Sequence, residues 1–165
     1  MVEMNYKVTP ESIGLDCNKA ADAAEKLNQY LANLQVMFIK LHNIHWNVEG
    51  VSFFDIHEKT QVLYEAVGEA IDLIAERIKM LGFYPVGSLY QALQMANIKE
   101  LPNTCYSGPT AASIVVHDLR LLIYQLRIIN DTVDDMYTGG LTGDAIVFYE
   151  KQHWLFSAYL TKCSN

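Results

Sequence analysis

Three of the five histidines in this 165-residue chain lie in the stretch HNIHWNVEGVSFFDIH, as His42, His45 and His57. Further along, Asp72 and Glu76 are four residues apart, which places both carboxylates one turn apart on the same face of a helix. Two imidazoles and two carboxylates form a mixed nitrogen and oxygen donor set that suits Fe(II), Zn(II) or Mn(II). Carboxylates also favour iron of higher valence, so this set could retain iron through its oxidation.

Each of these residues also has a purely structural interpretation. A single acidic residue on a helix most often faces solvent. His45, on an apolar stripe, could be a core histidine with one satisfied hydrogen bond, and His57 could be a polar residue at the start of a helix. The joint pattern therefore carries the metal hypothesis, and no single residue does.

The elements that must position these residues are helices. Apolar residues recur at steps of three and four, and no stretch of convincing length alternates as a strand would. The first helical segment should end at Gly50, and the second at Gly82 and Pro85. Thr110 could cap the third segment, and GGLTGD is typical of a turn before the fourth. The pattern predicts one all-α domain over residues 1–165 with helices at about 16–48, 53–81, 88–96 (short), 110–137 and 142–160. With short connections, this indicates a four-helix bundle with an extra short helix between the second and third.

The helix faces indicate where a metal site could form. His45 lies in the middle of the apolar stripe of its helix, whereas Asp72 and Glu76 lie roughly 150° to 180° from the centre of theirs. One bundle core would not collect all four groups. A contact between two chains could do so if the second helix presents its outer face to a partner.

The whole stretch HNIHWNVEGVSFFDIHEKTQVLYEAVGEAIDLIAERIKMLG resembles the signature of the Dps family, the mini-ferritins. The spacing is H-x11-H-x14-D-x3-E, accompanied by HWN, G-x-x-FF-x-x-H and AER. The short helix in the middle of the chain and Trp154 in the last helix also resemble the family. Several of these positions have no evident structural necessity, so chance agreement is a poor explanation.

The resemblance implies a ferritin-like fold and a homo-oligomeric shell of twelve subunits that oxidises Fe(II), preferentially with hydrogen peroxide, and stores the Fe(III) mineral against oxidative stress. It implies a mono-iron or di-iron ferroxidase centre at each two-fold interface. His45 and His57 would come from one subunit, and Asp72 and Glu76 from its partner. Trp46 would lie close to the iron and take up stray oxidising equivalents, although a packing role is an equal alternative.

Two further sets of residues follow from the resemblance. Many members have an acidic residue where this chain has Gln61, so one iron should bind well and the second weakly, with Glu65 as a possible substitute. Acidic residues near the last turn line pores through which Fe(II) enters, which makes Asp135 and Asp144 the pore candidates. A rival hypothesis, independent of the resemblance, is a di-iron enzyme whose site lies inside each bundle. Such enzymes use E-x-x-H units in pairs, and Glu150 and His153 form the one unit of this sequence, so the rival is disfavoured.

Charge separates iron storage from the alternative of a DNA-compacting architectural protein. The chain has 12 basic and 19 acidic residues and a net charge of −7. Lys7 is the one basic residue among the first eighteen, and Lys162 is the one among the last ten. Because DNA affinity depends on phosphate neutralisation, we expect no appreciable DNA binding. Three widely separated cysteines, no signal peptide and no membrane span predict free thiols and a cytoplasmic protein.

Overall fold

The computed structural model describes residues 7–162 and consists almost entirely of helices. The long helices are α1 (Cys17–Asn47), α2 (Phe53–Met80), α4 (Gly108–Thr132) and α5 (Met136–Leu160). A 3-10 turn, η1 (Pro10–Ile13), precedes them, and the short helix α3 (Leu89–Met95) lies in the connection between α2 and α4. The all-α bundle with one extra short helix is therefore as predicted, and the first three helical segments begin and end within one residue of their expected bounds.

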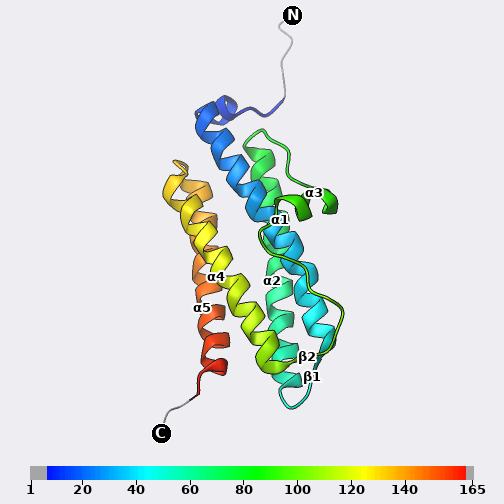
Figure 1. Cartoon of the computed structure of the whole chain (residues 1–165). Coiled ribbons are helices and arrows are strands. Elements are labelled where there is room, and N and C mark those ends of the chain that lie inside the picture. The colour runs from blue at the N-terminus through cyan, green and yellow to red at the C-terminus, as the bar shows by residue number, and fades with distance from the viewer. Residues whose placement is uncertain (1–6, 163–165) are drawn as a thin grey trace, which may run out of the picture.

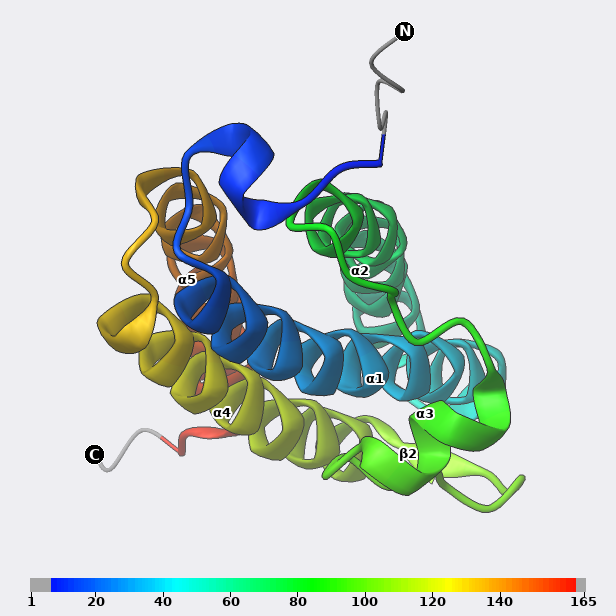
Figure 2. The same cartoon turned by 90° about the horizontal axis from the view of Figure 1, so that it is seen from above.

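The four long helices pack as two neighbouring pairs around one apolar core. Figures 1 and 2 show α1 beside α2 and α4 beside α5, with α3 against α1. The core is formed by the apolar stripes of these helices, including the fully buried Leu27, Leu63 and Leu119. Within residues 7–162, no helix is long and apolar enough to cross a membrane.

A tight reversal joins α1 to α2 and brings the two ends of the histidine-rich stretch together. Gly50 has φ of +99°, a conformation that glycine adopts without strain. Strand β1 (Val48–Glu49) pairs in parallel with β2 (Tyr106–Ser107), a contact that the sequence did not predict. At the start of α4, a Cβ on Gly108 would lie 2.6 Å from Ser52 and from the hydroxyl of Tyr159, so only glycine allows this close approach.

The predicted boundaries of the last two helices were wrong. Helix α4 ends at Thr132 rather than near 137, and α5 begins at Met136 rather than 142, so the glycines of GGLTGD lie inside a helix. The reason is a cap: the carboxylate of Asp135 accepts the backbone N–H of Thr138 at 3.0 Å and fixes the helix start before the glycines. Likewise Ser107, not Thr110, caps α4, because its hydroxyl accepts the Thr110 N–H.

Of the three cysteines predicted as free thiols, Cys17 and Cys105 are exposed and form no disulfide among the described residues. Cys163 lies outside the described residues, as do residues 1–6 and 164–165 of the two tails.

Candidate metal centre

His45 and His57 hold each other in place through the main chain. The Nδ1 atom of His45 lies 2.8 Å from the carbonyl oxygen of His57, and Nδ1 of His57 lies 2.8 Å from the carbonyl oxygen of His45. The two rings stack with centroids 3.6 Å apart and planes inclined by 20°. The α1–α2 reversal creates this reciprocal pair, because it places the last turn of one helix beside the first turn of the next.

These hydrogen bonds fix the form of both imidazoles. A carbonyl can only accept, so each Nδ1 carries a proton, and in the neutral ring Nε2 is then the nitrogen whose lone pair can bind a metal ion. Burial lowers the pKa of His45, and the imidazoles of His57 and His42 act in the same direction, while the bond to the His57 carbonyl acts against them. The net lowering favours the neutral ring, which is the form that binds metals.

Aromatic side chains surround the histidine pair. His42 points its Nδ1 at the carbonyl oxygen of Phe38, at 2.8 Å, and its ring stacks on Tyr64 with centroids 4.0 Å apart. Tyr64 also meets the ring of His45 edge-on at 5.2 Å. Trp46 is 69% exposed and its ring lies 5.2 Å from that of His42. His42 is therefore held within its own helix by the same type of Nδ1–carbonyl contact that holds the other two histidines.

Sequence reasoning did not identify Thr60, whose buried hydroxyl contacts both members of the histidine pair. Its side chain is fully buried, and its hydroxyl oxygen lies 3.3 Å from Nδ1 of His45. The hydroxyl donates to the carbonyl oxygen of Ile56 at 2.7 Å and reaches that of His57 at 3.0 Å. Its position one turn after His57, on the inner side of α2, was the signal available in the sequence.

Asp72 and Glu76 lie on the outer face of α2, as the helix periodicity predicted. Both side chains are exposed, and neither has a hydrogen-bond or ion-pair partner among residues 7–162. Asp72 follows His57 by fifteen residues, which corresponds to roughly 22 Å along the helix axis. One ion therefore cannot bind the histidines and these carboxylates of the same chain.

Within the described part of a single chain, no three His, Cys, Asp or Glu side chains come together as a metal site. The histidine pair offers two nitrogen ligands, and a four- to six-ligand site needs oxygen donors from elsewhere. The geometry thus separates the predicted donor set into two halves on one chain.

Gln61, the departure from the family pattern, is also engaged. Its amide nitrogen donates to the carboxylate of Glu65 at 2.8 Å, on the exposed side of α2 one turn after His57. Glu65 is thereby held near the position where many family members carry the acidic residue. This contact orients the carboxylate of Glu65, the candidate substitute ligand.

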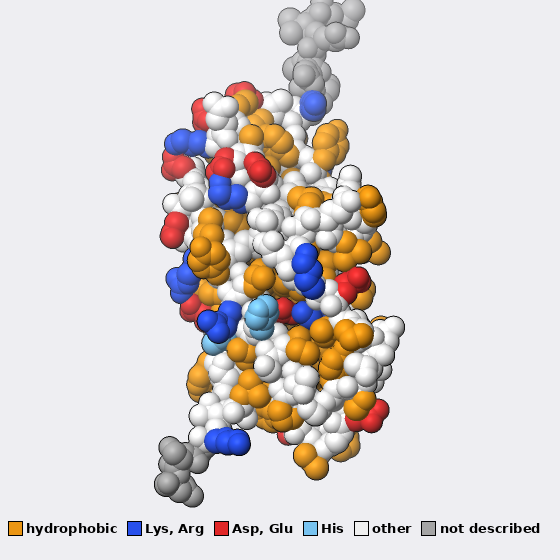
Figure 3. All heavy atoms as spheres, viewed as in Figure 1, with side chains coloured by type: hydrophobic (Ala, Val, Ile, Leu, Met, Phe, Trp, Pro, Cys, Tyr) orange, Lys and Arg blue, Asp and Glu red, His pale blue; other side chains and the backbone are white. Residues whose placement is uncertain are grey.

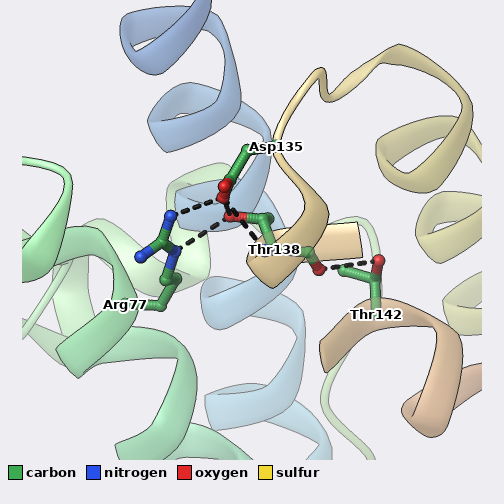
Figure 4. A network of polar contacts seen from close by, with 4 residues as sticks. All are labelled: Arg77, Asp135, Thr138 and Thr142. Atoms are coloured by element: carbon green, nitrogen blue, oxygen red, sulfur yellow. Dashed lines mark hydrogen bonds and ion pairs between the residues drawn. The ribbon is translucent and has the colours of Figure 1, made fainter. Parts of the chain in front are cut away.

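The two pore candidates differ in their surroundings. Asp135 pairs with the buried guanidinium of Arg77, caps α5 and accepts the hydroxyl of Thr138, which in turn accepts from Arg77 Nε at 2.9 Å (Figure 4). Burial acts to raise the pKa of Asp135, but the hydrogen bonds from Thr138 and the charge of Arg77 outweigh it and hold the pKa below its ordinary value. Asp144 is exposed on α5. Asp135 thus has a structural role of its own, whatever its part in a pore.

The E-x-x-H unit does not form a centre inside the bundle. Glu150 pairs with Arg127, and Glu150 and His153 line a groove on the surface between α4 and α5. Among residues 7–162, the one buried acidic side chain is Asp118, which pairs with the buried Lys40 at 2.6 Å. The described core therefore lacks the carboxylates that a di-iron site within one bundle needs.

Comparison with known proteins gives one consistent family. Residues 24–165 match the ferritin-like domain family. The chain is 37% identical over 140 residues to the DNA protection during starvation protein of Brevibacillus brevis, which covers 81% of this chain and 91% of that protein. It is 30% identical to the protein of the same name from Helicobacter pylori, over 82% of this chain and 96% of that protein.

Solved structures agree with the sequence relatives. A Dps protein from Vibrio cholerae, described as a member of a superfamily of ferritin-like diiron-carboxylate proteins, matches with a TM-score of 0.88 and 31% identity. The match covers 96% of this chain and all of that one. A Dps protein from Bacillus brevis matches with a TM-score of 0.84 and 34% identity, over 89% of this chain and all of that one.

Proposed function

The chain belongs to the Dps family of ferritin-like proteins, and we propose that it is a ferroxidase that oxidises Fe(II) with hydrogen peroxide and stores the product. The observation that carries the proposal is the reciprocal bonding of His45 and His57 through Nδ1, which leaves the Nε2 atom of each stacked ring without a partner among the described residues. Hydrogen bonds to Nδ1 that fix the ring and its tautomer are the usual support of a metal-binding histidine.

We propose that the remaining ligands come from a second copy of the chain. If two α2 helices pack antiparallel about a two-fold axis, the His57 end of each lies beside the Asp72 and Glu76 end of the other. An isologous contact of this kind produces two identical sites per dimer. The exposed apolar side chains Val62 and Leu73 on the outer side of α2 support such a contact.

The chemistry requires two electrons for each peroxide. Two Fe(II) ions would each give up one electron, the O–O bond of hydrogen peroxide would break, and two hydroxide ions and two Fe(III) would result. With both ions held near Glu76 and the histidines, the electrons transfer together and the one-electron step that releases hydroxyl radical is avoided. The oxidised iron would then pass to the interior of a shell, which the resemblance implies to contain twelve subunits.

Trp46 fits a protective role beside this site. Its ring is largely exposed, directly follows His45 in the chain, and lies next to His42, which stacks on Tyr64. Oxidising equivalents that escape the iron would meet these aromatic rings first. A packing role in the dimer contact is the alternative, because the exposed indole would also be covered there.

The test is anaerobic Fe(II) titration followed by hydrogen peroxide, with absorbance in the near ultraviolet as the readout. We expect about two Fe(II) oxidised per peroxide, and a rate about a hundredfold lower or more in Asp72→Ala/Glu76→Ala. Both side chains are exposed, so the variant should fold normally. Fast oxidation that survives the double substitution would show that the iron binds elsewhere.

DNA compaction is the alternative that charge disfavours. The sequence carries a net charge of −7, and its tails contribute only Lys7 and Lys162 as basic residues. We expect plasmid to migrate unchanged in a gel-shift assay at low magnesium, because phosphate neutralisation supplies most of the affinity. Retention of the plasmid would contradict this part of the proposal.

A further inference from the structure

A groove of about 760 Å³ lies on the surface between α4 and α5, away from the histidine pair of α1 and α2. Its polar lining is His117, Arg120, Tyr124 and Arg127 from α4, with Glu150 and His153 from α5. The four α4 residues follow one another at steps of three, four and three, so they form a continuous row along one face of the helix. Neither the apolar core nor the proposed iron site requires this row.

The groove is basic although the chain is acidic. It holds two arginines against one carboxylate, with two histidines as further N–H donors, in a chain of net charge −7. In Figure 3, histidine and Lys or Arg side chains gather over this part of the molecule. The guanidinium of Arg120 has no hydrogen-bond or ion-pair partner among residues 7–162, and Arg127 pairs with Glu150 through one of its nitrogens. Unused donors therefore face the groove.

His117 is supported from the core. Its Nδ1 lies 3.3 Å from a carboxylate oxygen of Asp118, and the other oxygen of Asp118 pairs with Lys40 at 2.6 Å. Asp118 and Lys40 are both buried, so this ion pair is a fixed anchor between α1 and α4. Lys40 neutralises the carboxylate, so Asp118 accepts this contact from His117 without adding a net negative charge beside the groove.

We propose that the α4–α5 groove binds a small phosphate-bearing anion. Guanidinium groups bind phosphate oxygens through paired N–H donors, and imidazole N–H groups add single donors. Tyr124 is 70% exposed between the two arginines on the same helix face, where its ring can stack on a nucleobase. The volume is that of a typical small-molecule site. Two kinds of ligand carry this phosphate group: an inorganic anion, such as phosphate or pyrophosphate, and a nucleotide.

The test is isothermal titration calorimetry of the assembled, iron-free protein with pyrophosphate and with ADP at low salt. Arg120→Gln should weaken binding by about tenfold or more, because it removes a charge-assisted contact. Glu150→Gln should strengthen binding, because it frees Arg127 and removes the one acidic group of the groove. Lys151→Gln, which removes a positive charge from an exposed position of α5 outside the groove, should leave the affinity unchanged.

Tyr124→Leu distinguishes the two sources. Weaker ADP binding with unchanged pyrophosphate binding would identify a nucleotide, whereas equal affinities in the variant and wild type would identify the inorganic anion. No heat with either ligand, or equal affinity in Arg120→Gln and wild type, would overturn the proposal. Circular dichroism and size-exclusion chromatography of each variant would verify that the fold and the assembly are intact, and none of these outcomes depends on ferroxidase activity.

Discussion

The two ends of α2 carry polar groups of opposite character. At the C-terminal end, the buried Arg77 pairs with Asp135 through Nη2 and donates through Nε to Thr138 of the same chain. At the N-terminal end, His57 and its partner His45 are held firmly through Nδ1, yet both Nε2 atoms lack a partner among the described residues. Arg77 therefore has partners within a single chain, whereas the Nε2 atoms of the histidine pair are the groups that we propose to bind iron.

Asp72 and Glu76 lie within the last turns of α2, just before Arg77, but on the opposite face of the helix. Arg77 turns inward and ties α2 to the start of α5, while the two carboxylates point outward and remain unpaired within the described chain. A buried charge without a partner is strongly unfavourable, so Arg77 must be satisfied for the chain to fold. Exposed carboxylates are free of that requirement and remain available for a metal ion. The residue that stabilises the fold and the carboxylates of the proposed site thus occupy opposite faces of one helix.

The largest effect should follow the loss of Arg77. Arg77→Met leaves Asp135 without its charge partner and Thr138 without a donor, so the free energy of unfolding should fall by about 3 kcal/mol. Urea denaturation followed by circular dichroism measures it. Lys151→Met, at an exposed position, should change stability by less than about 0.5 kcal/mol. A loss no larger than this control would contradict the structural role of Arg77.

A smaller effect should appear at the other end of α2. Thr60→Val keeps the shape of a fully buried side chain but removes the hydroxyl beside His45 and His57. Fe(II) affinity should fall by about tenfold, because the support of the ligand pair is loosened. Anaerobic Fe(II) titration measures the affinity. Unchanged affinity together with an unchanged oxidation rate would show that the main-chain bonds alone position the imidazoles.

The smallest effect should be a pH dependence at Asp135. Its pKa in the folded chain lies below the ordinary value of 3.8, so its ionised form stabilises the fold. That contribution is complete above the ordinary pKa and is lost as the pH falls through the lower value of the folded state. The stability advantage of wild type over Asp135→Asn should therefore shrink progressively as the pH falls, in denaturation measured between about pH 6 and pH 2. A constant difference would contradict the assignment.

Sequence periodicity was sufficient for the helices and for the face on which each candidate ligand lies. His45 is buried and Asp72 is exposed because apolar spacing determines which side of a helix turns inward. The last turn was mispredicted because glycines favour turns, while the actual helix start depends on the Asp135 cap and on Arg77, fifty-eight residues away. Tertiary contacts of that kind override local preference.

The hydrogen bonds that hold the histidine pair could not be predicted from the sequence either. Each imidazole is fixed by a carbonyl group, and every residue carries a carbonyl, so no residue type marks the contact. It depends on the closure of the α1–α2 reversal, including the two-residue pairing of β1 with β2. The sharing of the donor set between two chains stays a prediction, which rests on helix geometry and on the family resemblance.

The most direct test of the central claim is complementation between two inactive variants. His45→Ala/His57→Ala and Asp72→Ala/Glu76→Ala should each lack rapid peroxide-driven Fe(II) oxidation. When equal amounts are unfolded together and reassembled, half of the two-fold interfaces become mixed, and each mixed interface has one intact site. We predict recovery of about a quarter of the wild-type rate. A co-assembled sample with no recovery, although mass spectrometry shows mixed oligomers, would contradict a site shared between two chains.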